Sequence, residues 1–341
     1  MPSRAQRRLG KSGPMVSALG FGAMGLSASY GKVEENEARF AVLDRALELG
    51  TTFWDTSDVY ADSEDLLKLW FERTGKRDKI FLATKFAVTK GADGKPAIRS
   101  DPEYVRQACE RSLKRLGVEK IDLYYCHRVD KQTPIEKTVA AMVELKKEGK
   151  IGAIGLSEVS AQTIRRAEAI HHIDAVQLEY SPFALDIEAP EIGILATCRE
   201  LGIGVVAYSP LGRGFLTGQI TSPADFEEGD FRKYAPRYSE ENFPKNLELV
   251  KKLGEIARVK GCSTGQLSLA WLLKQGGDVI PIPGTKKIKY LEENVAAVDV
   301  QLTDEESAHI RAEIEKVEVR GDRYPPAFQE FSFGDTPELV A

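Results

Sequence analysis

Short apolar runs alternate with longer amphipathic segments along almost the whole chain. The apolar runs occupy residues 17–24, 52–55, 80–86, 121–127, 151–157, 175–180, 204–210 and 279–284, which is the pattern of buried strands. Amphipathic segments follow them at 34–49, 63–74, 101–116, 134–149, 161–171, 189–201, 245–260 and 287–298. Repetition of a strand and a helix requires parallel pairing with right-handed crossovers, and eight such units can close into a barrel.

Two local signals support the predicted helices. In segment 101–116 the apolar residues recur at steps of three and four and form one stripe, in which Cys109 is a small core residue. Several predicted helices end at a glycine that can adopt the left-handed conformation of a C-terminal cap: Gly50, Gly75, Gly117, Gly149 and Gly202.

Some stretches lie outside this alternation of strands and helices. Residues 212–242 form a long segment without a clear period, further helices are predicted at 263–275 and 304–317, and an aromatic tail runs from Tyr324 to Phe333. Long loops in compact domains are usually functional or disordered. We therefore predict an α/β protein, a single (β/α)8 TIM barrel with an N-terminal hairpin, two extra helices and a C-terminal tail. The whole chain, 1–341, forms one domain, with a core at about 9–317 and the tail 318–341 over the barrel mouth.

The segment 20–25, GFGAMG, matches the glycine pattern of dinucleotide-binding loops. That motif works only where a helix opens at the glycines, so that its N-terminus faces the pyrophosphate. Here residues 26–32 intervene before helical periodicity begins near Glu34, which argues against a Rossmann fold. The alternative is that the glycines bring the backbone close to another group at the end of the first strand.

The composition narrows the classes of function. The chain has 341 residues, 42% of them hydrophobic, and its 47 Lys+Arg against 52 Asp+Glu give a net charge of −5. This balance argues against nucleic-acid binding, and no apolar run approaches the ~18 residues of a membrane span. The basic residues 1–8 are not followed by an apolar signal core. Four scattered cysteines without a CxxC pair are typical of reduced thiols, so we expect a cytoplasmic protein.

Residues just past the carboxyl ends of barrel strands face the active site. At these positions the sequence places Asp55, Tyr60, Lys85 and His127. A tyrosine is a weak acid at neutral pH, and a neighbouring ammonium group lowers its pKa. Asp55 can keep a buried Lys85 charged, and His127 can orient a carbonyl oxygen and stabilise developing negative charge. The group suits proton donation during reduction of a carbonyl by an external hydride.

Each of these residues also has a structural interpretation. Asp55 could cap a helix or turn, Tyr60 could lie in a surface loop, and His127 alone could be a structural histidine. A buried Lys85 without a partner would be costly, and the joint occurrence favours catalysis. A metal-dependent hydrolase would need paired ligands at the strand ends, where only one His lies.

With these residues, the sequence resembles the aldo-keto reductase superfamily over nearly its whole length, from residue 9 to about 317. The matching segments are DTSDVY at 55–60, ATK at 83–85, CHR at 126–128, IGAIGLS at 151–157, YSPLGRG at 208–214, IPIPGTK at 280–286 and LEEN at 291–294. Residues 208–214 and 283–294 resemble the branch that includes pyridoxal reductases and auxin-induced-type reductases.

The resemblance implies NADP(H) bound across the barrel mouth without a Rossmann fold. It implies that Tyr60 donates the proton, that Asp55 and Lys85 adjust the pKa of Tyr60, and that His127 orients the substrate carbonyl. The implied cofactor contacts are Ser157 and Gln177 on the carboxamide, Tyr208 stacked on the nicotinamide, and further Gly22, Ala23, Met24, Asp55, Ser209, Pro210, Leu211, Gly212, Arg213, Gly214, Gly284, Thr285, Lys286, Tyr290, Glu293 and Asn294.

The substrate and the cofactor type are less directly specified. Lys286, Lys287 and Lys289 near a helix start favour the 2′-phosphate of NADPH over NADH. Glu158 stands where many relatives have Asn, so that contact to the carboxamide is not carried over. The candidate substrate-binding residues are Tyr30, Trp54, Phe86 and His127.

The function expected from the resemblance is NADPH-dependent reduction of an aldehyde or ketone to an alcohol. The expected partner is a small carbonyl compound, either an aromatic aldehyde or pyridoxal, with no nucleic acid and no membrane. The alternative is a cofactor-sensing regulatory subunit of the same fold with little turnover, as in potassium-channel β-subunits. The sequence leaves the oligomeric state and the physiological substrate open.

Overall fold

The computed structural model describes residues 5–91 and 94–340. Residues 1–4, 92–93 and 341 lie outside the described residues, and they include the first half of the basic N-terminal segment. Every predicted strand is present within the described part. The strands are β3 (Phe21–Gly22), β4 (Phe53–Asp55), β5 (Phe81–Phe86), β8 (Ile121–Cys126), β9 (Ile151–Ser157), β10 (Ala175–Glu179), β11 (Gly204–Tyr208) and β12 (Val279–Pro281).

These strands form one parallel sheet in the order β12-β11-β10-β9-β8-β5-β4-β3. The sheet curls so that its two outer strands meet, because Gly20 N–H donates to the Pro281 carbonyl at 2.9 Å and Gly22 N–H to the Pro283 carbonyl at 3.2 Å. The predicted (β/α)8 barrel is therefore confirmed, and its strands point their carboxyl ends to one mouth.

Glycines are required at the seam where the barrel closes. A Cβ atom on Gly284 would lie 2.5 Å from the Gly22 carbonyl oxygen, and a Cβ on Gly22 would lie 2.9 Å from that of Ile282. No side chain fits at such distances from backbone atoms. The glycine pattern at 20–25 therefore serves close backbone approach at the end of the first strand, as the alternative interpretation predicted.

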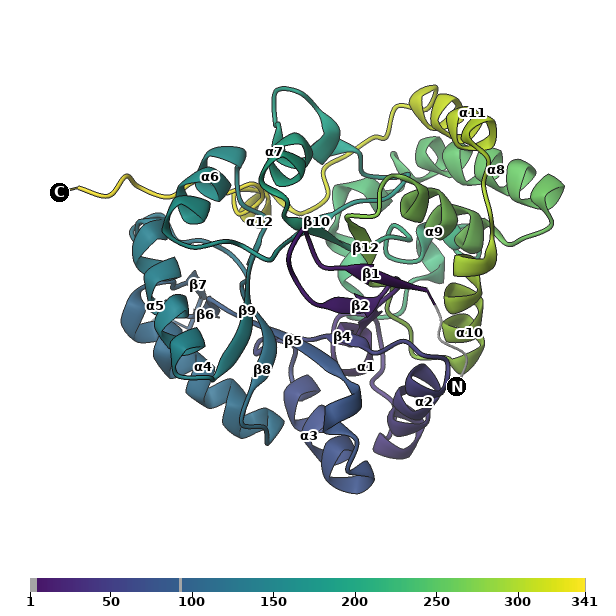
Figure 1. Cartoon of the computed structure of the whole chain (residues 1–341). Helices are drawn as coiled ribbons and strands as arrows, with labels where there is room; N and C mark the ends of the chain where they lie inside the picture. Colours follow the sequence, from purple (N-terminus) through teal and green to yellow (C-terminus); the bar gives the residue numbers. More distant parts are fainter. Residues whose placement is uncertain (1–4, 92–93, 341) are drawn as a thin grey trace.

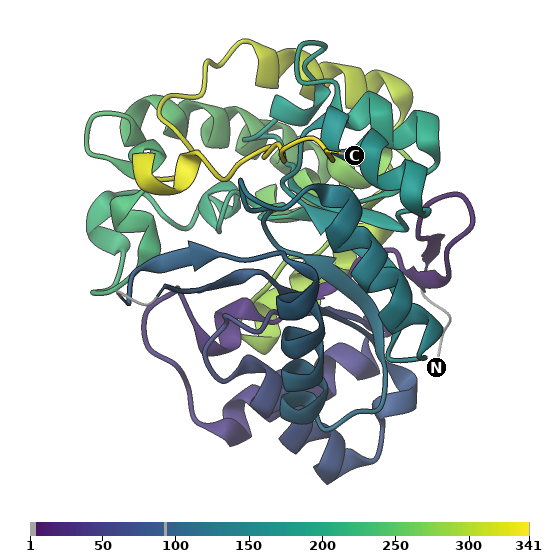
Figure 2. The same cartoon turned by 90° about the vertical axis from the view of Figure 1, so that its left-hand side faces the viewer.

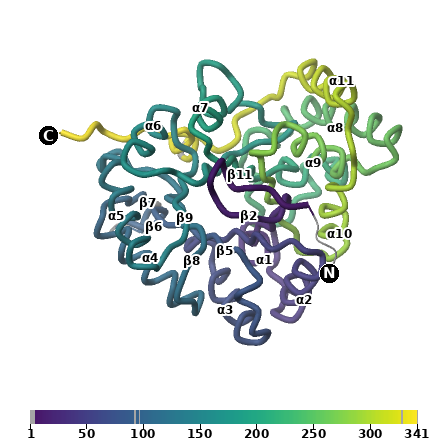
Figure 3. The backbone as a smooth tube through the Cα atoms, in the orientation of Figure 1, coloured from purple at the N-terminus to yellow at the C-terminus, as the bar shows by residue number. Residues whose placement is uncertain are grey.

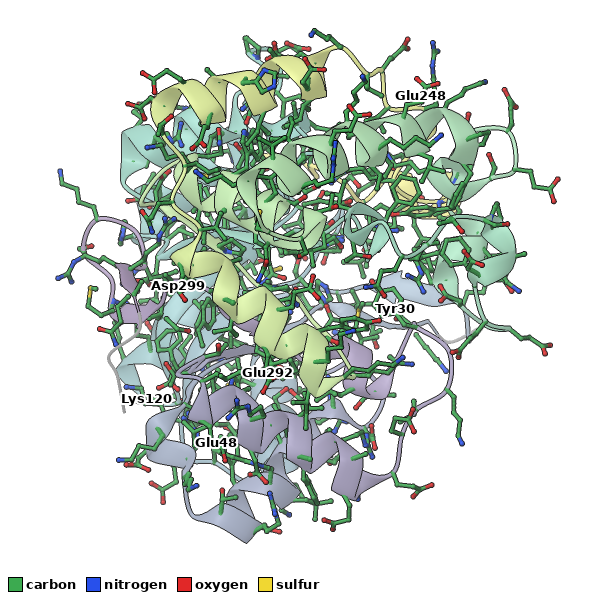
Figure 4. All side chains as sticks on the ribbon, turned by 90° about the vertical axis from the view of Figure 1, so that its right-hand side faces the viewer. Tyr30, Glu48, Lys120, Glu248, Glu292 and Asp299 are labelled. Atoms are coloured by element: carbon green, nitrogen blue, oxygen red, sulfur yellow. The ribbon has the colours of Figure 1, made fainter. Side chains whose placement is uncertain are left out.

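The helices form a ring around the strands (Figure 1). Helices α2 and α10 close this ring side by side, with Arg45 paired to Glu292 at 2.7 Å (Figure 4). The predicted glycine caps are confirmed, since all five have positive φ. The helices are α1 (Met24–Ser27), α2 (Asn36–Glu48), α3 (Ser63–Thr74), α4 (Pro102–Leu116), α5 (Ile135–Lys147), α6 (Ala161–Ile170), α7 (Ile194–Leu201), α8 (Phe243–Lys260), α9 (Thr264–Lys274), α10 (Ile288–Ala296), α11 (Asp304–Glu315) and α12 (Pro326–Gln329).

The N-terminal hairpin closes the amino-terminal end of the barrel. Strands β1 (Gln6–Arg8) and β2 (Met15–Ser17) pair antiparallel, and Leu9 and Val16 are buried in the cluster that fills the barrel interior. Arg7 ties the hairpin to the barrel wall, since its guanidinium donates to the Gly276 and Leu273 carbonyls, both at 2.6 Å. The open end of the barrel is consequently the opposite one.

Two segments at the mouth differ from the sequence expectation. A second hairpin, β6 (Val88–Lys90) and β7 (Pro96–Ile98), was not predicted, and it lies with α12 on the side away from the N-terminal hairpin (Figure 2). The long segment 212–242 is ordered into short 3₁₀ turns, such as Phe231–Tyr234.

The C-terminal tail crosses the barrel and continues past α6 (Figure 3). Gly334 is its main backbone attachment, because its N–H donates to the Glu158 carbonyl at 2.8 Å and its own carbonyl accepts from Ser160 N–H at 3.1 Å. Arg166 of α6 donates to the Thr336 and Pro337 carbonyls. Among the described residues, no helix has both the length and the apolar character needed to cross a membrane.

Candidate active site

A cavity of about 630 Å³ opens at the carboxyl ends of the barrel strands. Its wall runs from Asp55 and Tyr60 at one end to Glu293 and Asn294 at the other. Of the four predicted catalytic residues, Asp55, Tyr60 and His127 line this cavity, while Lys85 lies directly beneath it with no exposed surface. The barrel thus brings together residues from three neighbouring strands, as predicted.

Lys85 and Asp55 form a buried ion pair at the base of the cavity. Lys85 Nζ lies 2.5 Å from Asp55 Oδ1 and also donates to the Thr56 carbonyl at 2.7 Å. Gln177 Nε2 donates to the other carboxylate oxygen at 2.7 Å. Burial raises the pKa of Asp55 and lowers that of Lys85, and the attraction between the two opposes both shifts. The pair holds its geometry because every one of these polar groups has a partner.

Tyr60 packs against this pair. Lys85 Nζ lies 5.0 Å from the centroid of the Tyr60 ring, and the His127 ring lies edge-on to Tyr60 with a centroid separation of 5.8 Å. The sequence predicts that the charge of Lys85 favours the Tyr60 phenolate, but the net pKa shift of Tyr60 is upward because other groups dominate. Burial raises the pKa of Tyr60, and the negative charge of Asp55 adds to that rise, while Arg128 opposes it. The phenol is therefore protonated at neutral pH.

His127 is a neutral imidazole in this site. Burial, with the nearby charges of Arg128 and Lys85, holds the pKa of His127 well below its usual range. Its Nδ1 lies 3.2 Å from Ser57 Oγ. If the Ser57 hydroxyl donates to Nδ1, the ring proton is left on Nε2, where it can be donated to a ligand. Sequence reasoning did not single out Ser57, although it lies within the quoted segment 55–60.

Most of the predicted cofactor contacts line the same cavity. They are Gly22, Met24, Asp55, Ser157, Gln177, Tyr208, Ser209, Pro210, Leu211, Arg213, Gly214, Gly284, Thr285, Lys286, Tyr290, Glu293 and Asn294. Two predicted positions do not line it. Ala23 is fully buried and its N–H donates to the Asp55 carbonyl, and the Gly212 carbonyl accepts from the Tyr238 hydroxyl at 2.9 Å. These two residues therefore lie behind the residues that line the cavity.

Of the predicted substrate contacts, Tyr30 and His127 line the cavity, but Trp54 and Phe86 do not. Trp54 packs against Trp70 with ring centroids 4.8 Å apart, and Phe86 stacks on Tyr124 at 4.9 Å. Both belong to the core between the barrel and the helices. Side chains alternate along a strand, so the inward direction of the neighbouring Asp55 and Lys85 forces these aromatics outward. The prediction for Trp54 and Phe86 was wrong for this reason.

A buried charge cluster joins the tail to the cavity. Arg323 donates to both carboxylate oxygens of Glu158 at 3.2 and 3.1 Å, and the two side chains are 2% and 0% exposed. Glu179 lies 3.7 Å from Arg323 and 3.2 Å from Arg213. Glu158 Oε1 also accepts from the Tyr208 hydroxyl at 2.9 Å. Although burial alone favours the neutral acid, the charges of Arg323 and Arg128 lower the pKa of Glu158.

The same cluster fixes the two tyrosines at the mouth. Tyr324 of the tail lies 2.9 Å, hydroxyl to hydroxyl, from Tyr208, and its ring lies 4.6 Å from the Arg213 guanidinium carbon. Glu158, which departs from the Asn of many relatives, therefore connects the tail to Tyr208. Sequence reasoning could not find these partners, because they are far apart along the chain.

Further side chains of the wall were also missed. Arg128 lines the cavity beside His127, and the β6–β7 hairpin contributes Val88 and Ile98. The predicted Lys286 donates to the Tyr30 and Lys32 carbonyls at 2.6 and 3.0 Å, which holds its charge beside residues 30–32 in the cavity wall. The described residues hold no group of three or more His, Cys, Asp or Glu arranged to bind a metal ion.

Comparisons with known proteins agree with this geometry. The model of the aldo/keto reductase family matches residues 18–315. The aldo-keto reductase str7 of Strobilurus tenacellus is 54% identical over 322 residues, which are 93% of this chain and 94% of that protein. The aldo-keto reductase yakc of Schizosaccharomyces pombe, whose name specifies NADP(+), is 54% identical over 327 residues, 95% of this chain and 96% of that protein. A glycerol dehydrogenase structure from Gluconobacter oxydans has a TM-score of 0.80 at 26% identity, covering 94% of this chain and 98% of its own.

Proposed function

This chain belongs to the aldo/keto reductase family, and we propose that it reduces an aldehyde or ketone with hydride from NADPH and a proton from Tyr60. The observation that carries this proposal is the buried Asp55–Lys85 pair beneath Tyr60, with His127 beside the phenol. Asp55, Tyr60 and His127 line the same cavity as most of the residues expected to bind the cofactor.

The residues of the cavity fit an extended dinucleotide. Gly22 and Gly284 line the cavity at the seam, where the two backbone segments lie too close together to admit a side chain. Arg213 and Lys286 supply positive charge along the part of the wall that phosphates would occupy. Ser157 and Gln177 present polar groups at the catalytic end, beside the Tyr208 ring. When bound, NADPH would supply the hydride that the protein itself lacks.

The proton is held ready on Tyr60. Its raised pKa keeps the phenol protonated, and the alkoxide formed at the substrate is a far stronger base than a phenolate. Proton transfer to the alkoxide is therefore favourable even from this weak acid. The Lys85 ammonium, 5.0 Å from the ring centroid, stabilises the phenolate that remains.

His127 orients the substrate oxygen. With Nδ1 close to the Ser57 hydroxyl, its Nε2–H is free to donate to the carbonyl oxygen. A neutral imidazole donates this hydrogen bond without competing with Tyr60 for the proton transfer. Two donors thus face the oxygen on which negative charge develops.

The substitution Tyr60→Phe tests this assignment. We expect the reduction of 4-nitrobenzaldehyde to be abolished, while NADPH binding, followed by quenching of protein fluorescence, stays within about threefold of the wild type because only a hydroxyl is lost. An active variant would refute the role of Tyr60. A wild-type protein that binds NADPH without measurable turnover would instead favour the cofactor-sensing alternative.

The preference for NADPH over NADH rests on Lys286 and its neighbours. We expect Lys286→Met to raise the KM for NADPH by about tenfold and to leave the KM for NADH unchanged, because only NADPH carries the 2′-phosphate. Lys76→Met, which changes an exposed lysine that does not line the cavity, is the matched control. Equal KM values for the two cofactors in the wild type would contradict this part of the proposal.

The proposed substrate is an aromatic aldehyde. Tyr30, Phe328 and Phe331 line the cavity together with Val59 and Ile98, which gives it an apolar rim. An NADPH-oxidation screen over aldehydes and ketones, pyridoxal included, would identify the class. The likeness to pyridoxal reductases stays a prediction.

A further inference from the structure

Arg128 is the residue of the cavity wall whose charge the proposed mechanism leaves unused. It follows His127 in the chain and lines the cavity. Both hydrogen bonds of its guanidinium to described residues come from Nη1, to the His127 carbonyl at 2.6 Å and to Ser157 Oγ at 3.2 Å. These acceptors are neutral, and they leave the Nη2 and Nε donors of the guanidinium without a partner among the described residues.

The charges around Arg128 do not balance. Within the described residues, the other buried cations of this region each have a carboxylate, whereas Arg128 forms no salt bridge. Burial opposes a rise in the pKa of Arg128, whereas Tyr208, Tyr324 and then Glu158 raise it, but both oxygens of Glu158 are engaged by Arg323. The pairs are Lys85–Asp55 at 2.5 Å, Arg213–Glu179 at 3.2 Å and Arg323–Glu158 at 3.1 Å.

The unpaired donors of Arg128 remain accessible. No nitrogen of Arg128 is both buried and without a partner, although such atoms occur elsewhere in the described residues. Two adjacent N–H groups of a guanidinium match the two oxygens of a carboxylate, and charged hydrogen bonds of this kind are the strong ones. The cavity therefore offers one anion site next to the imidazole that orients the carbonyl.

We propose that Arg128 binds a carboxylate of the substrate, so that the protein favours carbonyl compounds that also carry a carboxylate group. This rests on the proposed carbonyl reduction. The substrate carboxylate neutralises the unpaired charge of Arg128, and the apolar rim of the cavity contacts the remainder of the substrate. Arg128 is thereby a specificity-determining residue, separate from the proton donor.

Matched pairs of substrates test the proposal. The probes are 3- and 4-carboxybenzaldehyde and their methyl esters, which have nearly the same shape and no charge. We expect the wild-type kcat/KM for the better acid to exceed that of its ester by about 10- to 100-fold, as for a paired charge. In Arg128→Met this ratio should fall to about 1, with the ester reduced at a rate within about threefold of the wild type.

Two controls separate this effect from folding and from cofactor binding. Arg128→Lys keeps the charge without the paired donors, and we expect it to retain part of the preference. Arg106→Met is the matched surface variant, since Arg106 is exposed on α4 and pairs with Glu148. NADPH binding and thermal unfolding are measured for each variant. If Arg128→Met does not fold, the acid-to-ester preference of Arg128→Lys is compared with that of the wild type instead.

The outcomes are distinct. A wild-type preference for the esters, or an equal loss of acid and ester reduction in Arg128→Met, would overturn the anion site. An equal loss accompanied by weaker NADPH binding would assign Arg128 to the cofactor instead. Reduction of the esters by the wild type tests the proposed function itself. A wild-type protein that does not reduce the esters would therefore contradict carbonyl reduction, and this result differs from those that overturn the anion site.

Discussion

The substitution Arg323→Met should release the C-terminal tail from the barrel mouth. It leaves the Glu158 carboxylate, whose side chain is 0% exposed, without its bidentate partner. The Tyr208 hydroxyl and the Glu179 N–H remain as hydrogen-bond donors to Glu158, but neither carries a charge. Removing one partner of a buried ion pair costs about 3–5 kcal/mol, because the other charge stays buried.

The protein can relieve this cost by local opening instead of global unfolding. Undocking of the tail exposes Glu158 to water and breaks the backbone bonds of Gly334 to Glu158 and Ser160. A loss of 3–5 kcal/mol would raise the population of the opened state by about 10²- to 10³-fold or more. The increase in the population of the opened state cannot exceed the value set by the free energy of docking of the tail in the wild type.

Amide hydrogen exchange measures this opening directly. We expect the peptide containing Gly334 to exchange at least about 100-fold faster in Arg323→Met, while strands β8 and β9 keep wild-type protection. Arg320→Met is the matched control, because Arg320 lies three residues upstream and its partner Glu318 is 71% exposed. Loss of that surface pair costs at most about 1 kcal/mol.

A second substitution separates the charge from the packing. In Glu158→Gln/Arg323→Met the buried charge is gone, so the double variant should recover most of the protection that the single variant loses. Exchange in Arg323→Met that is no faster than in Arg320→Met would refute the reasoning. No recovery in the double variant would show that packing of Arg323, for instance against Phe333, dominates.

Further predictions concern the buried Lys85–Asp55 pair, the pH dependence of stability and the barrel seam. Lys85→Met should abolish turnover and lower the free energy of unfolding by about 3–5 kcal/mol, since Asp55 stays buried and unpaired; adding Asp55→Asn should restore stability but not activity. Burial raises the pKa of Asp58 to about 7, so this acid destabilises the fold as pH rises from about 4 through 7. Asp58→Asn should therefore leave stability unchanged near pH 4 and raise it by up to about 4 kcal/mol above pH 7, as urea unfolding at both pH values would show. Gly284→Ala should cost about 1–3 kcal/mol in the same assay, because its Cβ would lie 2.5 Å from a backbone oxygen, whereas Gly277→Ala meets nothing within 4 Å and should be neutral.

The sequence by itself determined the order of the elements and the residues that we propose as the catalytic group. Apolar periodicity and glycine caps are local signals, so strands such as β9 and helices such as α3 were predicted to within a residue or two. The four proposed catalytic residues could be recognised because each lies at or shortly after the carboxyl end of a strand, and these ends must face the barrel mouth. The outward direction of Trp54 and Phe86 also follows from the sequence, because side chains alternate along a strand and the adjacent Asp55 and Lys85 point inward.

Only the tertiary structure decided which charges meet at the mouth. Glu158 and Arg323 are separated by 165 residues, and no local pattern pairs them. The pKa of Tyr60 likewise depends on how completely the fold excludes water from the phenol, a quantity that residue spacing does not contain. Secondary structure follows from interactions between near neighbours in the chain, whereas burial and ion pairing depend on which distant segments the closed barrel brings together.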